Sequence, residues 1–201
     1  MSTDRRTRLT PDERRAQLVA LGITLLAEEP LDALTIDILS ERAGVSRALL
    51  FHYFGSKQGL HREVVRTARD SMLHATEPVP ELPPLERLRD TLERIVRFVR
   101  EHRGTFYSLV RGVASGDSEV RAVVEEAREE QAGRVVAAFL ELGVPDTPLL
   151  RIALRSWVAF AEEALVESAL GTDLSSDEIV GFLERSARGV VAAIPVPGRP
   201  D

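Results

Sequence analysis

Residues 34–60 decide the fold, and they read LTIDILSERAGVSRALLFHYFGSKQGL. Apolar residues recur here every three or four positions, which is the period of a helix. Thr35 is the expected N-cap of a helix that ends at Ala43, and Gly44 supplies the residue just past that end. Ser46 caps the next helix two residues later. Two short helices joined by about three residues are typical of a helix-turn-helix.

The outward face of the second short helix differs from an ordinary solvated face. At about 100° per residue, Leu50 and Phe54 fall on the core side. The opposite side carries small, aromatic and basic groups, which suit a contact in the DNA major groove. The alternative is that Phe51 and Tyr53 pack on a neighbouring helix. The predicted DNA-reading residues are Ser46, Arg47, Ala48, Leu49, Phe51, His52 and Tyr53.

Two further residues in this stretch are suited to holding phosphates. Lys57 is the only lysine among 26 basic residues, and it lies in the first turn of the next predicted helix. Free backbone N–H groups and the helix dipole favour an anion there. Thr35 offers a hydroxyl and a second helix start for another phosphate contact.

Taken together, residues 34–60 resemble the DNA-binding signature of the TetR family of transcriptional regulators. The resemblance rests on Thr35, Gly44-Val45-Ser46, the run from Leu50 to Phe54, and Ser56-Lys57, which stand in the family's order. Two positions depart from the family: Phe51 replaces the more usual Tyr, and Leu49 stands where Thr or Ser is common. The resemblance implies phosphate contacts by Thr35 and Lys57, and DNA reading by Arg47, Ala48, Leu49, Phe51, His52 and Tyr53.

The rest of the 201-residue chain is read as helical. Hydrophobic residues make up 44% and charged residues 29%, as in an ordinary globular protein. We expect an all-α fold of about nine helices. It comprises an N-terminal three-helix helix-turn-helix DNA-binding domain and a C-terminal helical domain for ligand binding and dimerisation. The helices are expected at 11–29, 35–43, 46–54, 56–75, 85–102, 103–114, 118–142, 148–170 and 176–194.

A proline-rich stretch and a change of charge mark the domain boundary. Prolines stand at 78, 80, 83 and 84, and no helix crosses them. Residues 1–75 carry 11 basic against 10 acidic residues, whereas residues 76–201 carry 15 against 22. Only the first part approaches a polyanion without general repulsion. The predicted division is 1–56 for DNA binding, 57–75 as a connecting helix, 76–84 as the proline-rich connection, 85–194 for effector binding and dimerisation, and 195–201 as a tail.

The N-terminal residues Arg5, Arg6 and Arg8 form a loose basic arm. It lies along the minor groove, as such arms do in other helix-turn-helix proteins, or it is a solvated tail. No apolar segment follows it, so we expect no secretory signal, and no stretch approaches the ~20 apolar residues of a membrane span. The chain is expected in the cytoplasm.

The acidic part is predicted to hold a dimer interface and an effector site. Wide apolar stripes on the last two helices allow two copies to pack as a four-helix interface, as the family resemblance also implies. The alternative is burial within one chain. The predicted interface comprises Ala161, Ala164, Leu165, Ser168, Leu183, Ala187, Val190, Val191 and Ile194.

Scarce aromatic residues gather in the segment that would enclose an effector. Each of them has the alternative of being an ordinary core residue. The candidate lining comprises His102, Phe106, Tyr107, Phe139, Trp157 and Phe160.

Catalytic patterns are missing from the sequence. It contains no Gly-rich phosphate loop, no His-Glu-x-x-His and no Gly-x-Ser-x-Gly, and cysteine is absent. Paired acids such as Glu162-Glu163 are interpreted as solvated faces. We therefore predict a homodimeric regulator without cofactor or enzymatic activity, which binds a palindromic double-stranded DNA operator and responds to an unidentified small molecule. The alternative is a helical ligand-binding or protein-interaction module without DNA binding.

Overall fold

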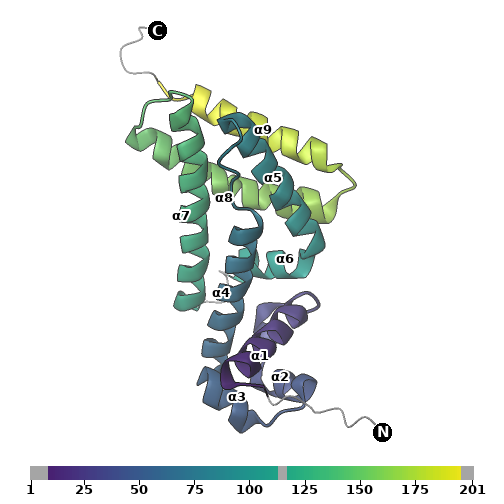
Figure 1. Ribbon diagram of the computed structural model, residues 1–201. Coiled ribbons are helices and arrows are strands. Elements are labelled where there is room, and N and C mark those ends of the chain that lie inside the picture. The colour runs from purple at the N-terminus through teal and green to yellow at the C-terminus, as the bar shows by residue number, and fades with distance from the viewer. Residues whose placement is uncertain (1–8, 113–116, 196–201) are drawn as a thin grey trace.

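The computed structural model describes residues 9–112 and 117–195, and the regular structure in these ranges is helical (Figure 1). The predicted all-α fold is confirmed. A short 3-10 turn, η1 (Leu31–Ala33), links the first two α-helices. The α-helices are α1 (Pro11–Leu26), α2 (Ile36–Ala43), α3 (Arg47–Phe54), α4 (Lys57–Ala75), α5 (Pro84–Glu101), α6 (Arg103–Gly112), α7 (Ser118–Glu141), α8 (Pro148–Gly171) and α9 (Ser176–Ala192).

Local capping signals set most helix ends. Thr10 begins α1 and Ser175 begins α9, each in a capping box with a glutamate three residues later. Gly44 ends α2 with φ of 63°, a left-handed conformation that glycine adopts without strain. α1 ends at Leu26 rather than at the predicted residue 29, because Pro30 restricts the preceding backbone and residues 27–29 form a turn. Residues 113–114 of the predicted 103–114 helix lie outside the described ranges.

The N-terminal core is not built from α1–α3 alone. Leu18 and Leu26 of α1 and Leu39 of α2 are fully buried against Val64 of α4. The first turns of α7 also join this core through three buried valines at 120, 123 and 124. The N-terminal helices α1–α3 and the C-terminal helices are therefore packed together as well as joined by α4.

A second close contact joins the two ends of the molecule. Gly104, near the start of α6, lies directly against the backbone of Ala27 at the end of α1. A Cβ atom at Gly104 would stand 2.3 Å from the carbonyl oxygen of Ala27. Only glycine lets α6 approach α1 so closely.

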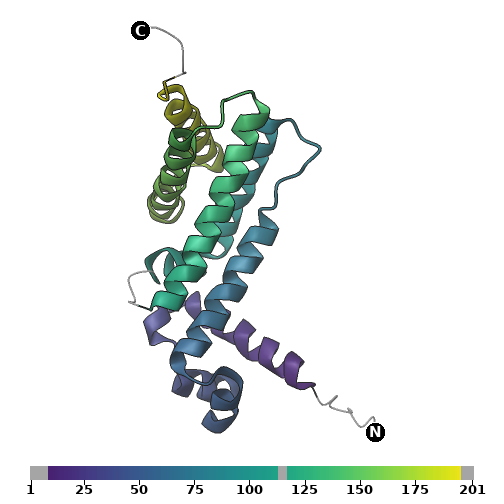
Figure 2. The ribbon, with the colours of Figure 1, turned by 90° about the vertical axis from the view of Figure 1, so that its left-hand side faces the viewer.

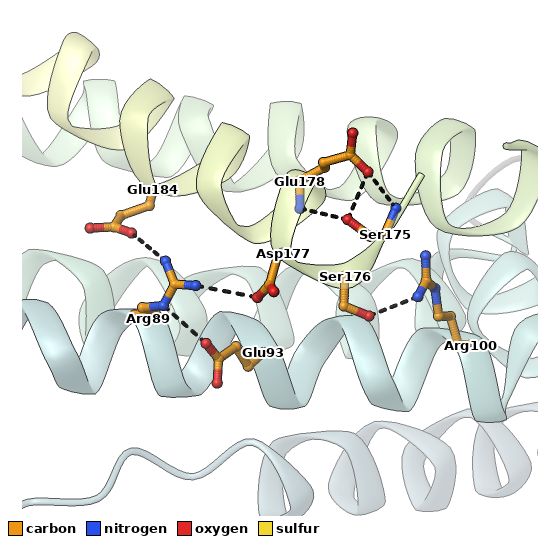
Figure 3. Close-up of polar contacts among 8 residues, drawn as sticks. All are labelled: Arg89, Glu93, Arg100, Ser175, Ser176, Asp177, Glu178 and Glu184. Atoms are coloured by element: carbon orange, nitrogen blue, oxygen red, sulfur yellow. Dashed lines mark hydrogen bonds and ion pairs between the residues drawn. The ribbon is translucent and has the colours of Figure 1, made fainter. Parts of the chain in front are cut away.

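The C-terminal core lies between α5, α7, α8 and α9, with Val96, Leu154 and Leu183 fully buried. Polar contacts join α9 to α5, which lies beside it (Figure 3). Arg89 of α5 contacts Glu93, Asp177 and Glu184, and Arg100 donates from Nη1 to the Ser176 hydroxyl at 2.7 Å. These contacts fix the start of α9 relative to α5.

α4 extends from the N-terminal helices to the C-terminal core, and α7 runs beside it (Figures 1 and 2). Beyond α4, residues 76–83 connect to α5. No helix within residues 9–112 and 117–195 is long and apolar enough to cross a membrane.

Candidate nucleic-acid interface and ligand cavity

The shape of α3 follows from its cap and from two buried anchors. The Ser46 hydroxyl accepts a hydrogen bond from the Leu49 amide at 3.3 Å, and Leu50 and Phe54 are buried in the N-terminal core. The opposite face consequently points to solvent. The exposed residues on it are Arg47, Ala48, Phe51 and His52.

The two aromatic residues flanking this face differ in their placement. Phe51 is 45% exposed, so it does not pack on a neighbouring helix. Tyr53 is half-buried and packs against the N-terminal core, with its ring centroid 5.4 Å from that of His52. Leu49 is also half-buried. The alternative of internal packing therefore applies to Tyr53 and not to Phe51.

Arg47 has an intramolecular partner that the sequence did not indicate. Its Nε lies 2.7 Å from Oδ1 of Asp37 on α2, and both side chains are more than half exposed. An exposed ion pair of this kind contributes about 0–1 kcal/mol. Arg47 can therefore exchange Asp37 for a DNA group at little cost.

The predicted phosphate-holding residues lie at helix starts. Lys57 Nζ donates to the Asp32 carbonyl at 2.8 Å, which ties η1 to α4. Because an ammonium group has three donors, that bond leaves two for a phosphate. The Thr35 hydroxyl caps α2 by accepting from the Ile38 amide at 3.2 Å. The tight turn between Phe54 and Lys57 brings the Phe54 carbonyl against the first turn of α4. It depends on Gly59, because a Cβ atom there would stand 2.0 Å from the Phe54 carbonyl oxygen.

A buried histidine supports this arrangement from behind. His61 of α4 lies with its Nε2 2.7 Å from the carbonyl oxygen of Leu34, the residue before Thr35. Burial lowers the pKa of His61, although the bond to Leu34 acts in the opposite direction. The neutral ring with its proton on Nε2 satisfies this carbonyl. His61 therefore positions the start of α2 relative to α4.

The second candidate site is an apolar cavity of about 80 Å³ in the C-terminal core. Its walls come from α4, α5, α6, α7 and α8, and Pro78 of the 76–83 connection also lines it. Apolar side chains predominate, among them Leu92, Ile95, Phe106 and Trp157. This volume is below the ~300–1,000 Å³ of clefts that hold drug-sized ligands, so such a ligand must widen the cavity.

A smaller cavity of about 30 Å³ lies closer to the N-terminal helices. It is lined by Val65 and Arg69 of α4, among other residues. Met72, Phe106 and Glu162 line both cavities and so form the partition between them. The unbranched Met72 side chain adapts readily to a new shape, which makes it the natural point at which the larger cavity widens.

Few polar groups line the larger cavity. They are Arg87, Thr91, Gln131, Arg134 and Glu162. Burial raises the pKa of Glu162, while Arg128 counteracts this by donating from Nε to Oε2 at 2.8 Å. The interpretation of Glu162 as part of a solvated face is wrong, because its side chain is only 20% exposed and stands in the cavity wall.

The structure brings two of the six predicted effector residues to the cavity. Phe106 and Trp157 line it, and Trp157 Nε1 donates to the Ser186 hydroxyl at 2.9 Å. Phe139 is buried in the surrounding core and does not line the cavity. The other three, His102, Tyr107 and Phe160, are exposed.

The polar lining residues were missed because each appears on a charged helix face of the sequence. Arg87, Gln131 and Arg134 show no signal that separates them from solvated neighbours. Only the fold brings them to the cavity.

The predicted dimer residues lie mostly inside the single chain. Ala161, Leu165, Leu183 and Ala187 are buried in the C-terminal core. The others are half-buried, namely Ala164, Ser168, Val190, Val191 and Ile194. Four of the nine predicted residues therefore pack within the single chain, and for the five half-buried ones the interface stays a prediction.

The outward face of the α8/α9 pair carries a different apolar set. Ile152 is 63% exposed, and Phe160 and Phe182 are each nearly half exposed. The rings of Phe160 and Phe182 lie against each other, with centroids 5.8 Å apart. The sequence did not indicate this face, because helical period alone does not say which of two apolar sides turns outward.

Comparison with known proteins gives two family matches. Residues 18–64 match the family described as bacterial regulatory proteins, tetR family, and residues 84–187 match the tetracyclin repressor-like C-terminal domain. A crystal structure of a tetR-family transcriptional regulator from Streptomyces coelicolor superposes with a TM-score of 0.77 and 27% identity, covering 92% of this chain and 82% of that one.

Curated relatives match mainly through the N-terminal part. HTH-type transcriptional regulator BetI of Vibrio vulnificus is 36% identical over 74 residues, which is 36% of this chain and 37% of that protein. The chain thus spans little more than a third of this relative's length, and 28% of BetI from Vibrio atlanticus. HTH-type transcriptional repressor KstR2 of Rhodococcus jostii is 25% identical over 174 residues, covering 87% of this chain and 76% of that protein.

Proposed function

Because the chain belongs to the TetR family of bacterial regulatory proteins, we propose that it is a sequence-specific DNA-binding transcriptional regulator that acts as a homodimer. Its operator would be a pseudo-palindrome in double-stranded DNA, since the half-sites of a two-fold symmetric dimer mirror its symmetry. The place of action would be the cytoplasm. The proposal involves no enzymatic activity.

The observation that carries this proposal is the outward face of α3. It exposes Arg47, Phe51 and His52 on a helix that Leu50 and Phe54 anchor rigidly to the core. Arginine and histidine bond base edges, and an aromatic ring meets a thymine methyl group. Lys57 and Thr35 flank this helix where phosphates would lie.

Dimerisation is proposed through the outward face of α8 and α9. Phe160 of α8 and Phe182 of α9 form an exposed apolar pair across two adjacent helices, and Ile152 of α8 is exposed as well. The same two helices of a second copy would cover this face around a two-fold axis. A dimer is needed because one recognition helix alone contacts too little DNA for useful specificity.

Regulation is proposed through the larger cavity. A small molecule bound there would favour one position of α4, which starts at Lys57 by the DNA and reaches the cavity at Met72. Spreading the two α3 helices away from a separation of about 34 Å would release the operator. We propose repression as the sense of control, with activation as the alternative.

The direct test is a footprint on the DNA upstream of the chain's own gene and its neighbours. We expect protection of a pseudo-palindromic sequence, and increased transcription from that promoter when the gene is deleted. Decreased transcription would indicate an activator. The alternative function, a module without DNA binding, would give no protected sequence while small molecules still perturb the fluorescence of Trp157, which is the single tryptophan.

A further inference from the structure

The charged groups that line the larger cavity are not equally neutralised. The carboxylate of Glu162 is neutralised by Arg128, whose Nε and Nη2 both lie 2.8 Å from Oε2. Arg87 forms a bidentate salt bridge with Glu141, with Nη1–Oε1 at 2.9 Å and Nη2–Oε2 at 2.7 Å. These two lining groups therefore have charge partners of good geometry.

Arg134 is the exception. Its carboxylate partner is Glu130, bonded only through Nε at 3.1 Å, and Glu130 is 55% exposed whereas Arg134 is 16% exposed. Because Glu130 is solvated, it neutralises the charge of Arg134 poorly, and the ion pair contributes little to stability. The remaining contacts of Arg134 in the described part of the chain are neutral carbonyls, those of Leu73 and Thr76 at 3.3 and 3.1 Å from Nη1. Its Nη2 has no hydrogen-bond partner among the described residues.

From this imbalance we propose that the effector is an apolar molecule with one anionic group, a carboxylate or similar oxyanion, which Arg134 binds. This inference rests on the proposed regulatory function and names the ligand class of its cavity. The apolar walls would take the body of the molecule, and the planar guanidinium would take the oxyanion. Gln131, one turn from Arg134 on α7 and also in the lining, would supply an amide donor.

Binding of the anion at Arg134 would act directly on α4. Thr76, the fully buried C-cap of α4, accepts from Arg134 through its carbonyl and from Gln131 Nε2 through its hydroxyl at 3.4 Å. An oxyanion is a stronger acceptor than a neutral carbonyl and would draw these donors away. The end of α4 would then lose its ties to α7, which gives the ligand different affinities for the two α4 positions.

The experiment uses three probes with ten carbon atoms each: decanoate, decanol and decylamine. Binding is followed by Trp157 fluorescence in the full chain, because Trp157 lines the cavity. We expect decanoate to bind about tenfold or more tightly than decanol, and decylamine to bind most weakly. Decanoate should also lower operator affinity, whereas decanol at equal occupancy should lower it less.

Variants of Arg134 separate charge recognition from general packing. Arg134→Gln should reduce the preference for decanoate over decanol to about twofold or less, and Arg134→Lys should restore most of it. Arg151→Gln is the matched control, because Arg151 pairs with Asp146 on the surface of α8 and does not line the cavity. It should leave the preference unchanged.

Three results would overturn the inference. Equal binding of decanol and decanoate would show that the cavity does not recognise an anionic group. Preferred binding of decylamine would make Glu162 the recognising group. No change in fluorescence with any probe would exclude this ligand class. Operator binding measured without probe on the same preparations reports separately on the proposed DNA-binding function. A failure of the ligand class is thereby distinguished from a failure of that function.

Discussion

The DNA-binding end and the cavity end of this molecule use their side chains in opposite ways. In α3, two residues face the core and the proposed DNA-contacting groups face outward, so the cap and the helical period suffice to predict their exposure. At the cavity, the functional groups face inward between five helices. Which residues meet there depends on how those helices pack, and no local pattern reports it.

The contrast shows where substitutions should act on binding and where they should act on folding. Outward residues of α3 contribute little to the core, so their loss should change DNA affinity alone. Cavity residues belong to the C-terminal core as well as to the ligand site. Their removal therefore combines a functional effect with a loss of stability.

The largest expected effect is that of Trp157→Ala at the cavity end. Trp157 is buried and its indole donates to the Ser186 hydroxyl, so its removal leaves a void and deletes that hydrogen bond. We expect the free energy of unfolding to fall by about 3–5 kcal/mol. Denaturant unfolding followed by circular dichroism measures it. Tyr107→Ala, at a residue 48% exposed, is the control and should change stability by less than about 0.5 kcal/mol. Similar losses in both variants would contradict the assigned burial.

The next effect separates the two faces of α9 through adjacent residues. Phe182→Arg changes the outward face and should dissociate the proposed dimer while each chain stays folded, at a cost of about 2 kcal/mol or more in association. Leu183→Arg changes a fully buried residue and should unfold the chain. Sedimentation and circular dichroism distinguish these outcomes. Leu142→Arg, at an exposed leucine just past α7, should remain dimeric, and a dimeric Phe182→Arg protein would place the interface elsewhere.

Sequence reasoning predicted the fold and the outward face of α3 because their signals are local. Thr35 and Ser46 each cap the helix that they were expected to cap. It did not predict that Arg134 lines the cavity, because the sequence of this turn of α7 would be the same whether the turn faced solvent or a cavity. The exposure of Phe160 and Phe182 was likewise not predicted, since the packing of neighbouring helices decides which side of a helix is covered.

A smaller effect is expected from Arg47, His52 and Lys57 at the DNA-binding end. Arg47→Ala and His52→Ala should each weaken operator binding by about 1–3 kcal/mol while mostly sparing nonspecific DNA, because base contacts carry the sequence information. Lys57→Ala should weaken binding to all sequences and lower the salt slope by about one per half-site. Titrations at several salt concentrations measure both. An unchanged salt slope for Lys57→Ala would show that Lys57 serves only to hold the Asp32 carbonyl.

The smallest effect is a pH dependence that should differ in sign between the two ends. Burial lowers the pKa of His61 below its ordinary value of 6.5, so in acid the unfolded chain takes up a proton that the folded chain does not. Stability from this group is therefore present above pH 6.5 and falls as the pH decreases towards the folded pKa. Burial raises the pKa of Glu162, so its contribution is present below its ordinary value of 4.5 and is lost as the pH rises towards the folded pKa.

Thermal unfolding between pH 7 and pH 5 tests the His61 contribution directly. His61→Gln keeps a donor for the Leu34 carbonyl without a titrating ring, and we expect it to lose less stability on acidification than the unchanged chain does. His74→Gln is the matched control, since His74 lies on the same helix with 89% of its side chain exposed. It should keep the pH dependence of the unchanged chain. Equal profiles for both variants would mean that His61 contributes only by packing, and that the link between α4 and Leu34 is insensitive to protonation.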